Sequence, residues 1–425
     1  MKFDTIAVQG AHDPSKNRNS ISVPIYQTTA YSFDTVEYAA DLFDLKCAGD
    51  IYTRISNPTT QVLEERLAML EGGVGSLVVS SGQSASLIAI LNIAKAGDEI
   101  VASQNIYGGT LNLIGFTLEK MGIKTIFVAS ENPEDFEKAI TDKTVCIFAE
   151  ALTNPKISVA DIETLSKIAH NHKIPLIIDS TVATPYLLRP FEFGADIVVH
   201  SLTKYINSHG NSMGGAIIDS GNFDWACSDK FRGLTDKDPS YHDISYTETF
   251  GKAAYIVKAR THLLRDLGCC ISPFNSYLAL QGLETLSLRM QRQSDSALAV
   301  AKYLKGQKHI SQVFYPALEG DKYYELAQKY LPKGASSLLS FVIDGDGAVA
   351  TKFIENLNLL IHATNIGDTK TIVTYPALTT HRQLTKEQLE ECGISESFIR
   401  LSIGLEDVGD IIEDISSALD KAFSS

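Results

Sequence analysis

Long apolar runs, clustered cysteines and an excess of positive charge are all missing from this chain of 425 residues. No apolar run reaches the roughly 20 residues that a membrane-spanning helix needs, and no apolar segment follows the opening MKFDTIAVQG. We therefore expect neither a membrane protein nor a secretory leader. The 51 acidic residues outnumber the 37 basic ones, for a formal net charge of −14. That charge argues against nucleic acid or anionic membranes as main partners.

The cysteines are few for this length and make no CxxC pair or zinc-like cluster. We expect no metal site, and we expect reduced, mostly buried thiols in a cytoplasmic protein. Neither GxGxxG nor a P-loop sequence is present, which argues against a nucleotide-binding enzyme. The six cysteines are Cys47, Cys146, Cys227, Cys269, Cys270 and Cys392.

Two short, unbroken apolar runs stand close together near the middle of the chain. Residues 176–178 form one run, which ends at Asp179, and residues 196–200 form the other, which ends shortly before Lys204. Runs without alternation are typical of interior strands in a parallel sheet that is covered on both faces. Ligands bind beyond the carboxyl ends of such strands, so Asp179 and Lys204 should face one cleft. This pair suits pyridoxal 5'-phosphate (PLP), because a lysine forms its Schiff base and an acid keeps its pyridine nitrogen protonated.

The neighbours of the lysine decide between this interpretation and a plain one, in which both side chains are ordinary surface residues. Ser201 and Thr203 place hydroxyl groups beside the lysine that suit a phosphate. The sequence Ser-Leu-Thr-Lys-Tyr-Ile-Asn-Ser-His over residues 201–209 resembles the lysine signature of the Cys/Met-metabolism family of PLP-dependent enzymes. Ser208 stands where that family usually has glycine.

The resemblance covers nearly the whole chain and implies an α/β fold. The implied fold is the PLP-dependent transferase fold type I, with a mostly parallel sheet in a large domain and a smaller α+β domain after it. We expect an N-terminal arm over residues 1–57 that reaches the neighbouring subunit. A PLP-binding large domain would span residues 58–271, and a C-terminal small domain residues 272–425. The family suggests a homotetramer, built as a dimer of dimers.

Three turns of the large domain supply further candidates for the cofactor site. Strand, small-residue turn and helix start follow one another over residues 77–93, which offers free backbone N–H groups to an anion. The resemblance implies phosphate contacts from Gly82 and Gln83. It also implies that the Tyr107 ring stacks on the pyridine and assists proton transfer, and that Asn154 donates to the phenolic oxygen. The plain alternatives are an aromatic residue that covers the sheet for Tyr107 and an ordinary Asn-Pro turn for Asn154.

The arm and the small domain each carry an arginine with a predicted role. The Tyr-x-Arg-x-x-Asn-Pro element at residues 52–58 resembles the family element that binds the phosphate of the neighbouring subunit. This resemblance assigns Tyr52 and Arg54 to act in trans; a solvated leader is the alternative. Arg400, in an Arg-Leu-Ser-x-Gly sequence, matches the arginine that binds the α-carboxylate of the substrate, with Asn365 as a second contact. A sheet-edge position with its charge in solvent is the alternative for Arg400.

A long polar segment over residues 219–251 and Gly109 distinguish between subgroups of the family. The segment resembles that of O-acetylhomoserine sulfhydrylases, and methionine γ-lyases carry cysteine where this chain has Gly109. The implied activity is γ-replacement of O-acetyl-L-homoserine by sulfide, giving L-homocysteine and acetate, a step of methionine biosynthesis. Lys204, Asp179 and Tyr107 would be the catalytic residues. A cystathionine γ-synthase, a γ-lyase and a catalytically idle PLP-binding scaffold are the alternatives.

Overall fold

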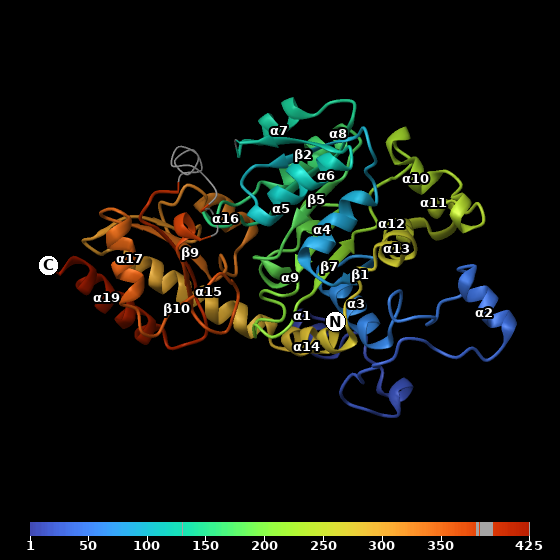
Figure 1. Cartoon of the computed structure of the whole chain (residues 1–425), viewed down its shortest axis with the longest axis horizontal. Helices are drawn as coiled ribbons and strands as arrows, with labels where there is room; N and C mark the ends of the chain where they lie inside the picture. Colours follow the sequence, from blue (N-terminus) through green and yellow to red (C-terminus); the bar gives the residue numbers. More distant parts are fainter. Residues whose placement is uncertain (130, 380–381, 383–393, 425) are drawn as a thin grey trace.

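Two sheets organise the chain in a computed structural model that describes residues 1–129, 131–379, 382 and 394–424 (Figure 1). The larger sheet has seven strands in the order β1-β7-β6-β5-β4-β2-β3. The smaller sheet has five strands in the order β10-β11-β12-β9-β8. Figure 1 shows the two sheets in separate halves of the molecule, each with its own helices. The predicted α/β fold with a second, smaller α+β unit is confirmed.

The larger sheet is parallel except at β7, which runs antiparallel to both of its neighbours, β1 and β6. The two apolar runs of the sequence become the neighbouring parallel strands β5 and β6. Their carboxyl ends therefore meet at one edge of the sheet, as predicted. The strands are β1 (Gly75–Val79), β2 (Glu99–Ser103), β3 (Lys124–Val128), β4 (Thr144–Glu150), β5 (Leu176–Asp179), β6 (Ile197–Ser201) and β7 (Gly215–Asp219).

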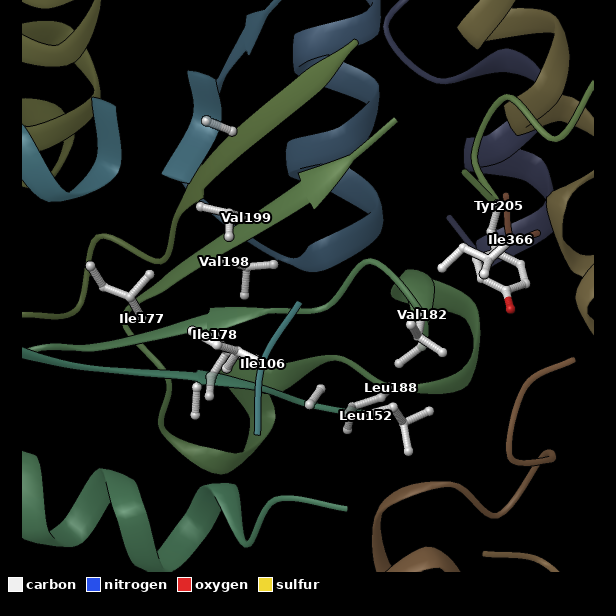
Figure 2. Packing of buried hydrophobic residues seen from close by; sticks show 14 of the residues in the cluster. Ile106, Leu152, Ile177, Ile178, Val182, Leu188, Val198, Val199, Tyr205 and Ile366 are labelled. Atoms are coloured by element: carbon white, nitrogen blue, oxygen red, sulfur yellow. The ribbon is translucent and has the colours of Figure 1, made fainter. Parts of the chain in front are cut away.

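Both faces of β5 and β6 are covered, which explains why their apolar runs do not alternate. Figure 2 shows the side chains of Ile177, Ile178, Val198 and Val199 among other apolar residues, and all four are buried. The helices around this sheet are α3 (Pro58–Glu71), α4 (Gly82–Leu91), α5 (Gly108–Asn112), α6 (Leu118–Lys120), α7 (Pro133–Ala139), α8 (Ile162–Asn171), α9 (Thr184–Leu187), α10 (Arg232–Thr235), α11 (Tyr246–Phe250), α12 (Ala254–Lys258) and α13 (Arg265–Leu267).

The residues Asn57-Pro58 predict the start of a helix and Gly72-Gly73 its end, and helix α3 begins and ends there. The Asn57 side chain caps it by accepting a hydrogen bond from the Thr59 N–H at 3.0 Å, and Pro58 occupies its first position. Gly72 ends the helix with a φ of 83°, a left-handed conformation that favours glycine.

The second sheet packs against helices that follow residue 272. The amphipathic pattern after Ser272-Pro273 predicts one long helix over residues 274–303, and this prediction is wrong: α14 (Pro273–Glu284) and α15 (Leu286–Lys305) are separated at Thr285. Neither glycine nor proline stands at Thr285, so the local residue types do not mark the break. The remaining elements are β8 (Ile310–Phe314), α16 (Tyr324–Tyr330), β9 (Leu338–Ile343), α17 (Gly347–Glu355), β10 (Ile361–His362), β11 (Ile372–Thr374), β12 (Phe398–Ser402) and α19 (Val408–Phe423).

The N-terminal arm carries two short helices, α1 (Phe3–Gln9) and α2 (Val36–Phe43). Helix α1 packs on α3 and α14, whereas α2 lies at the outer end of the arm (Figure 1). Asp44 follows α2 directly, and its Oδ1 lies 3.4 Å from Nε2 of His242 in the polar segment 219–251. That segment contains α10 and α11, so it is ordered and touches the arm of its own chain.

The environment of the cysteines differs from our expectation. Of the five cysteines in the described residues, only Cys146 is buried; Cys47 is exposed because it lies in the arm, which has no core of its own. Cys392 lies outside the described residues. The described helices include none that is both long and apolar enough to cross a membrane.

Candidate cofactor and substrate site

The carboxyl ends of β5 and β6 bring the predicted lysine and carboxylate to one edge of the large sheet. Asp179 is the last residue of β5, and Lys204 lies in the turn after β6. Burial raises the pKa of Asp179, although its Oδ1 accepts a hydrogen bond from the Thr181 N–H at 2.9 Å. Burial and the charge of Arg400 lower the pKa of Lys204, whose Nζ donates to Asn365 Oδ1 at 2.8 Å. A buried lysine of this kind releases its proton more readily than a surface lysine, as a general base must.

Arg400 lies inside the small sheet, on β12 between β11 and β9, and is 4% exposed. The sheet-edge alternative is therefore wrong. Its Nη1 donates to Asn154 Oδ1 at 2.8 Å, and its Nη2 donates to Thr374 Oγ1 at 2.7 Å and to the Asn365 carbonyl at 3.2 Å. Burial lowers its pKa to about 10, and its Nε has no hydrogen-bond partner among the described residues. Because the acceptors are neutral, the arginine keeps a charge and a donor for an anion.

The contact with Arg400 also fixes the orientation of the Asn154 amide. Its Oδ1 accepts from the arginine, so Nδ2 is the atom left to donate to a ligand. This is the atom that the predicted contact with the phenolic oxygen of PLP requires. Asn154 and Lys204 thus reach Arg400 and Asn365 from the large sheet, so the predicted cleft corresponds to the place where the two sheets meet.

The start of α4 forms a close approach with β6. A Cβ atom at Gly82 would lie 2.7 Å from the Cβ of Ser201, so only glycine allows the turn to come this near. The first turn of the helix leaves the N–H groups of Gly82 and Gln83 without helical acceptors. This geometry fits a phosphate, with the Ser201 side chain beside it. The Thr203 hydroxyl donates to the Gly214 carbonyl at 3.3 Å and accepts from the Gly214 N–H at 3.2 Å, so its contact with the phosphate stays a prediction.

Tyr107 stands at the start of α5 with its side chain 51% exposed, so the ring does not fill the core. Its backbone N–H donates to Glu150 Oε1 at 2.6 Å. A Cβ atom at Gly109 would lie 2.5 Å from Cε1 of the tyrosine ring and 3.2 Å from Gln83 Nε2. Glycine at position 109 therefore leaves the ring room to lie in its present place.

Tyr52 and Arg54 are apart from this cleft in their own chain. Arg54 Nη1 donates to the carbonyl oxygen of Arg265 in α13, and its guanidinium lies 5.5 Å from the centre of the Tyr52 ring. The hydrogen bonds described for this pair do not reach Lys204 or Arg400. Their predicted contact with a phosphate in the neighbouring subunit stays a prediction.

Ser208, the departure from the family pattern, has a physical explanation. Its φ is 66°, the left-handed region that favours glycine. It is buried, and its hydroxyl donates to the carbonyl of Gly367 at 2.8 Å. The hydrogen bond offsets part of the backbone strain, so serine is accommodated beside the lysine loop.

Sequence reasoning missed two polar residues at the floor of the cleft. Thr181 Oγ1 accepts from the Ser201 N–H at 2.8 Å and links the ends of β5 and β6. Glu150, the last residue of β4, is buried and pairs in register with Asp179 on β5. Glu150 ends β4 and Thr181 lies two residues after β5, so both stand at a strand end, the same signal that identified Asp179.

The polar groups of the cleft fit the functional groups of PLP. The lysine amine, the strand-end carboxylate, the free amide of Asn154 and the cradle at Gly82 match the Schiff base, pyridine nitrogen, phenolic oxygen and phosphate in turn. Within the residues that the structure describes, no group of three or more His, Cys, Asp or Glu side chains could hold a metal ion.

Comparison with known proteins identifies the family. The model of the Cys/Met metabolism PLP-dependent enzymes matches residues 4–420. The chain is 49% identical over 427 residues to O-acetyl-L-homoserine sulfhydrylase from Leptospira meyeri. This match covers 98% of this chain and 96% of that relative. It is 42% identical over 436 residues to homocysteine/cysteine synthase from Saccharomyces cerevisiae, with 99% and 98% covered.

A solved structure is similar to this chain in both fold and sequence. The crystal structure of a putative O-acetylhomoserine (thiol)-lyase from Campylobacter jejuni has a TM-score of 0.96 and 42% identity, covering 99% of this chain and 100% of that one. It contains a lysine that carries a pyridoxyl monophosphate group. The match confirms the predicted fold and cofactor. This chain belongs to the Cys/Met-metabolism family of PLP-dependent enzymes.

Proposed function

We propose that this protein is an O-acetylhomoserine sulfhydrylase, which converts O-acetyl-L-homoserine and sulfide to L-homocysteine and acetate. The observation that carries the proposal is that Lys204 lies close to Arg400, whose charge lowers the pKa of the lysine. Arg400 is buried, and its Nε has no hydrogen-bond partner among the described residues. It gains weight because full-length relatives at 40–49% identity bear the name of this activity. Such a site takes an amino acid by its carboxylate and holds its α-carbon beside a lysine amine.

The residues around the cofactor have separate tasks in this proposal. Bound PLP supplies a conjugated ring that accepts the electrons left when a proton departs from the substrate. Lys204 holds the cofactor, and its amine then removes the α-proton and returns protons along the substrate chain. Asp179 keeps a proton on the pyridine nitrogen, and Asn154 donates through Nδ2 to the phenolic oxygen. The Tyr107 ring would stack on the pyridine of bound PLP and assist proton transfer.

Different groups hold the substrate and the phosphate in this proposal. Arg400 binds the α-carboxylate through its free N–H groups, with Asn365 as a second contact. Gly82, Gln83 and Ser201 hold the phosphate, together with Thr203. Expulsion of acetate from the γ-carbon and addition of sulfide then take place between these two anchors, with the reacting carbons beside the Lys204 amine.

We infer that the arm completes this site in a neighbouring subunit, where Tyr52 and Arg54 bind the phosphate. The arm exposes apolar side chains without a covering core, with Ile21 91% and Val36 89% exposed. A second copy of the chain is the partner that such a surface suits. We propose a homotetramer built as a dimer of these dimers.

The proposed organisation has three parts: an arm over residues 1–57, a PLP-binding domain over 58–271 and a small domain over 272–425. The division places one sheet in each domain and the cleft between them. The five described cysteines are free thiols, which supports a place in the reducing cytoplasm.

Product identity is the test of this function. Purified protein with PLP and O-acetyl-L-homoserine receives sulfide in one tube and L-cysteine in another, and O-acetyl-L-serine replaces the ester in a third. We expect homocysteine from sulfide and little cystathionine from cysteine. Mainly cystathionine would assign a cystathionine γ-synthase, and keto acid with ammonia would assign a γ-lyase. No turnover in any tube would leave the scaffold alternative. The control is Lys204→Ala, which should give no product.

A further inference from the structure

Glu150 is a buried carboxyl group at the floor of the cleft to which no role has yet been given. It ends β4, the strand beside β5, and is paired in register with Asp179. Its Oε1 accepts the backbone N–H of Tyr107 at 2.6 Å, and the backbone N–H of Asn154 lies near enough to lower the pKa of the carboxyl group. One carboxyl group therefore binds the backbone of Tyr107 and lies beside that of Asn154, two residues that we expect to meet the cofactor from different sides.

We propose that Glu150 is a positioning residue, whose carboxyl group fixes the backbones of Tyr107 and Asn154 so that the ring and the amide meet PLP correctly. Tyr107 needs such a support because it stands at the start of a five-residue helix with its side chain 51% exposed. Asn154 follows β4 in an irregular turn. Without the Glu150 carboxyl group as acceptor, the backbone segments at Tyr107 and Asn154 would lose this support. The inference rests on the proposed roles of these two residues.

The electrostatics of the carboxyl pair agree with a supporting role. Burial and the negative charge of Asp179 raise the pKa of Glu150 well above its usual value. For Asp179, by contrast, burial alone raises the pKa, with hydrogen bonds from Thr181 and the charge of His200 opposing it. Of the two carboxyl groups, Glu150 is therefore the one on which the charge of its neighbour acts to favour the protonated form. A neutral group can hold two backbones without competing for the proton on the pyridine nitrogen.

Glutamine is the variant that separates position from charge. Glu150→Gln keeps a carbonyl oxygen in place for the Tyr107 N–H and is neutral, whereas Glu150→Ala removes the acceptor. We measure the dissociation constant of PLP from each apoprotein by equilibrium dialysis, and the visible circular dichroism of the bound cofactor. We expect Glu150→Ala to weaken PLP binding at least tenfold and to change the dichroic band. Glu150→Gln should stay within about threefold of the unmodified protein.

The matched control is Asp219→Asn, another buried carboxyl group that accepts a backbone N–H, here from Gly221 at 2.8 Å. Because β7 is antiparallel to β6, Asp219 lies at the opposite edge of the sheet, and its substitution should leave PLP affinity unchanged. If Glu150→Ala does not fold, Glu150→Asp takes its place, since the shorter side chain withdraws the acceptor by one methylene.

A double variant tests whether Glu150 acts through the tyrosine. Glu150→Ala should weaken PLP binding less in a Tyr107→Ala background than in the unmodified protein, because the ring that it positions is already absent. Equal PLP affinity in all single variants, an equal loss in Gln and Ala, or additive effects would each overturn the inference. The readout needs no substrate. An unmodified protein that binds PLP and makes no homocysteine would therefore refute the proposed function and not the role of Glu150.

Discussion

Replacing Arg400 by lysine keeps a positive charge in the cleft and removes the planar guanidinium. Arginine has five N–H groups. Three of them already donate to Asn154, Thr374 and Asn365, so two N–H groups, including Nε–H, are left for the substrate carboxylate. Lysine has three donors on one nitrogen and cannot serve both these acceptors and a carboxylate with two hydrogen bonds.

The expected loss follows from the number of hydrogen bonds to the carboxylate. One hydrogen bond between charged groups contributes about 1.5–3 kcal/mol. Loss of one such bond therefore raises KM for O-acetyl-L-homoserine by about 10- to 100-fold. The effect on kcat should be smaller, because the carboxylate is bound before and during the reaction alike.

Steady-state kinetics at saturating sulfide measure this change, with PLP affinity and urea unfolding recorded for the same protein. Arg289→Lys is the matched control: Arg289 is also 4% exposed, with its pKa lowered to about 10 by burial. It donates to backbone carbonyls, including that of Tyr205 at 2.7 Å, and its substitution should lower the free energy of unfolding with KM within about threefold. An Arg400→Lys protein with unchanged KM and reduced stability would refute our reasoning. Arg400 would then only join the two sheets.

Three further predictions concern other positions of the site and the sheet. Gly109→Ala places a Cβ atom 2.5 Å from the present Tyr107 ring, so we expect weaker PLP binding and a changed dichroic band; an unchanged band would contradict the crowding. Ser208→Ala keeps the left-handed φ of 66° and loses the hydroxyl bond to Gly367, so urea unfolding should show a loss of about 1 kcal/mol. Ser208→Gly should be the more stable of the two variants, and the reverse order would contradict the assignment of backbone strain to this position. Burial raises the pKa of Asp219 to about 7 from 3.8, so the folded state binds an extra proton between these values and loses stability as pH rises through them. Asp219→Asn should reduce the fall in unfolding free energy between pH 5 and pH 8 by about 2 kcal/mol, and an unchanged fall would show that Asp219 is not its source.

Local patterns in the sequence identified most of the elements that carry the site. Unbroken apolar runs predicted β5 and β6 because a strand covered on both faces has no polar side. Asn57, Pro58 and Gly72 marked the ends of α3 because caps depend on neighbouring residues only. The polar residues that follow each strand identified Asp179 and Lys204, since the carboxyl ends of parallel strands share an edge.

Other features depended on residues far apart in the chain. Arg400 and Asn154 are 246 residues apart, and only the packing of the two sheets brings them to 2.8 Å. The break at Thr285 and the exposure of Cys47 likewise follow from packing and not from residue type.

The sequence by itself thus determined which residue types stand at the strand ends, and through them the family and the cofactor. The tertiary structure decided which of these side chains are buried, which hydrogen bonds they form and which donors they retain. Glu150 shows the difference: as a residue type it reads as a surface acid. Its burial beside Asp179, under the backbone of Tyr107, makes it part of the site. The physical reason is that burial and charge partners are properties of the packed chain, whereas helix caps and strand periodicity depend on residues close in sequence.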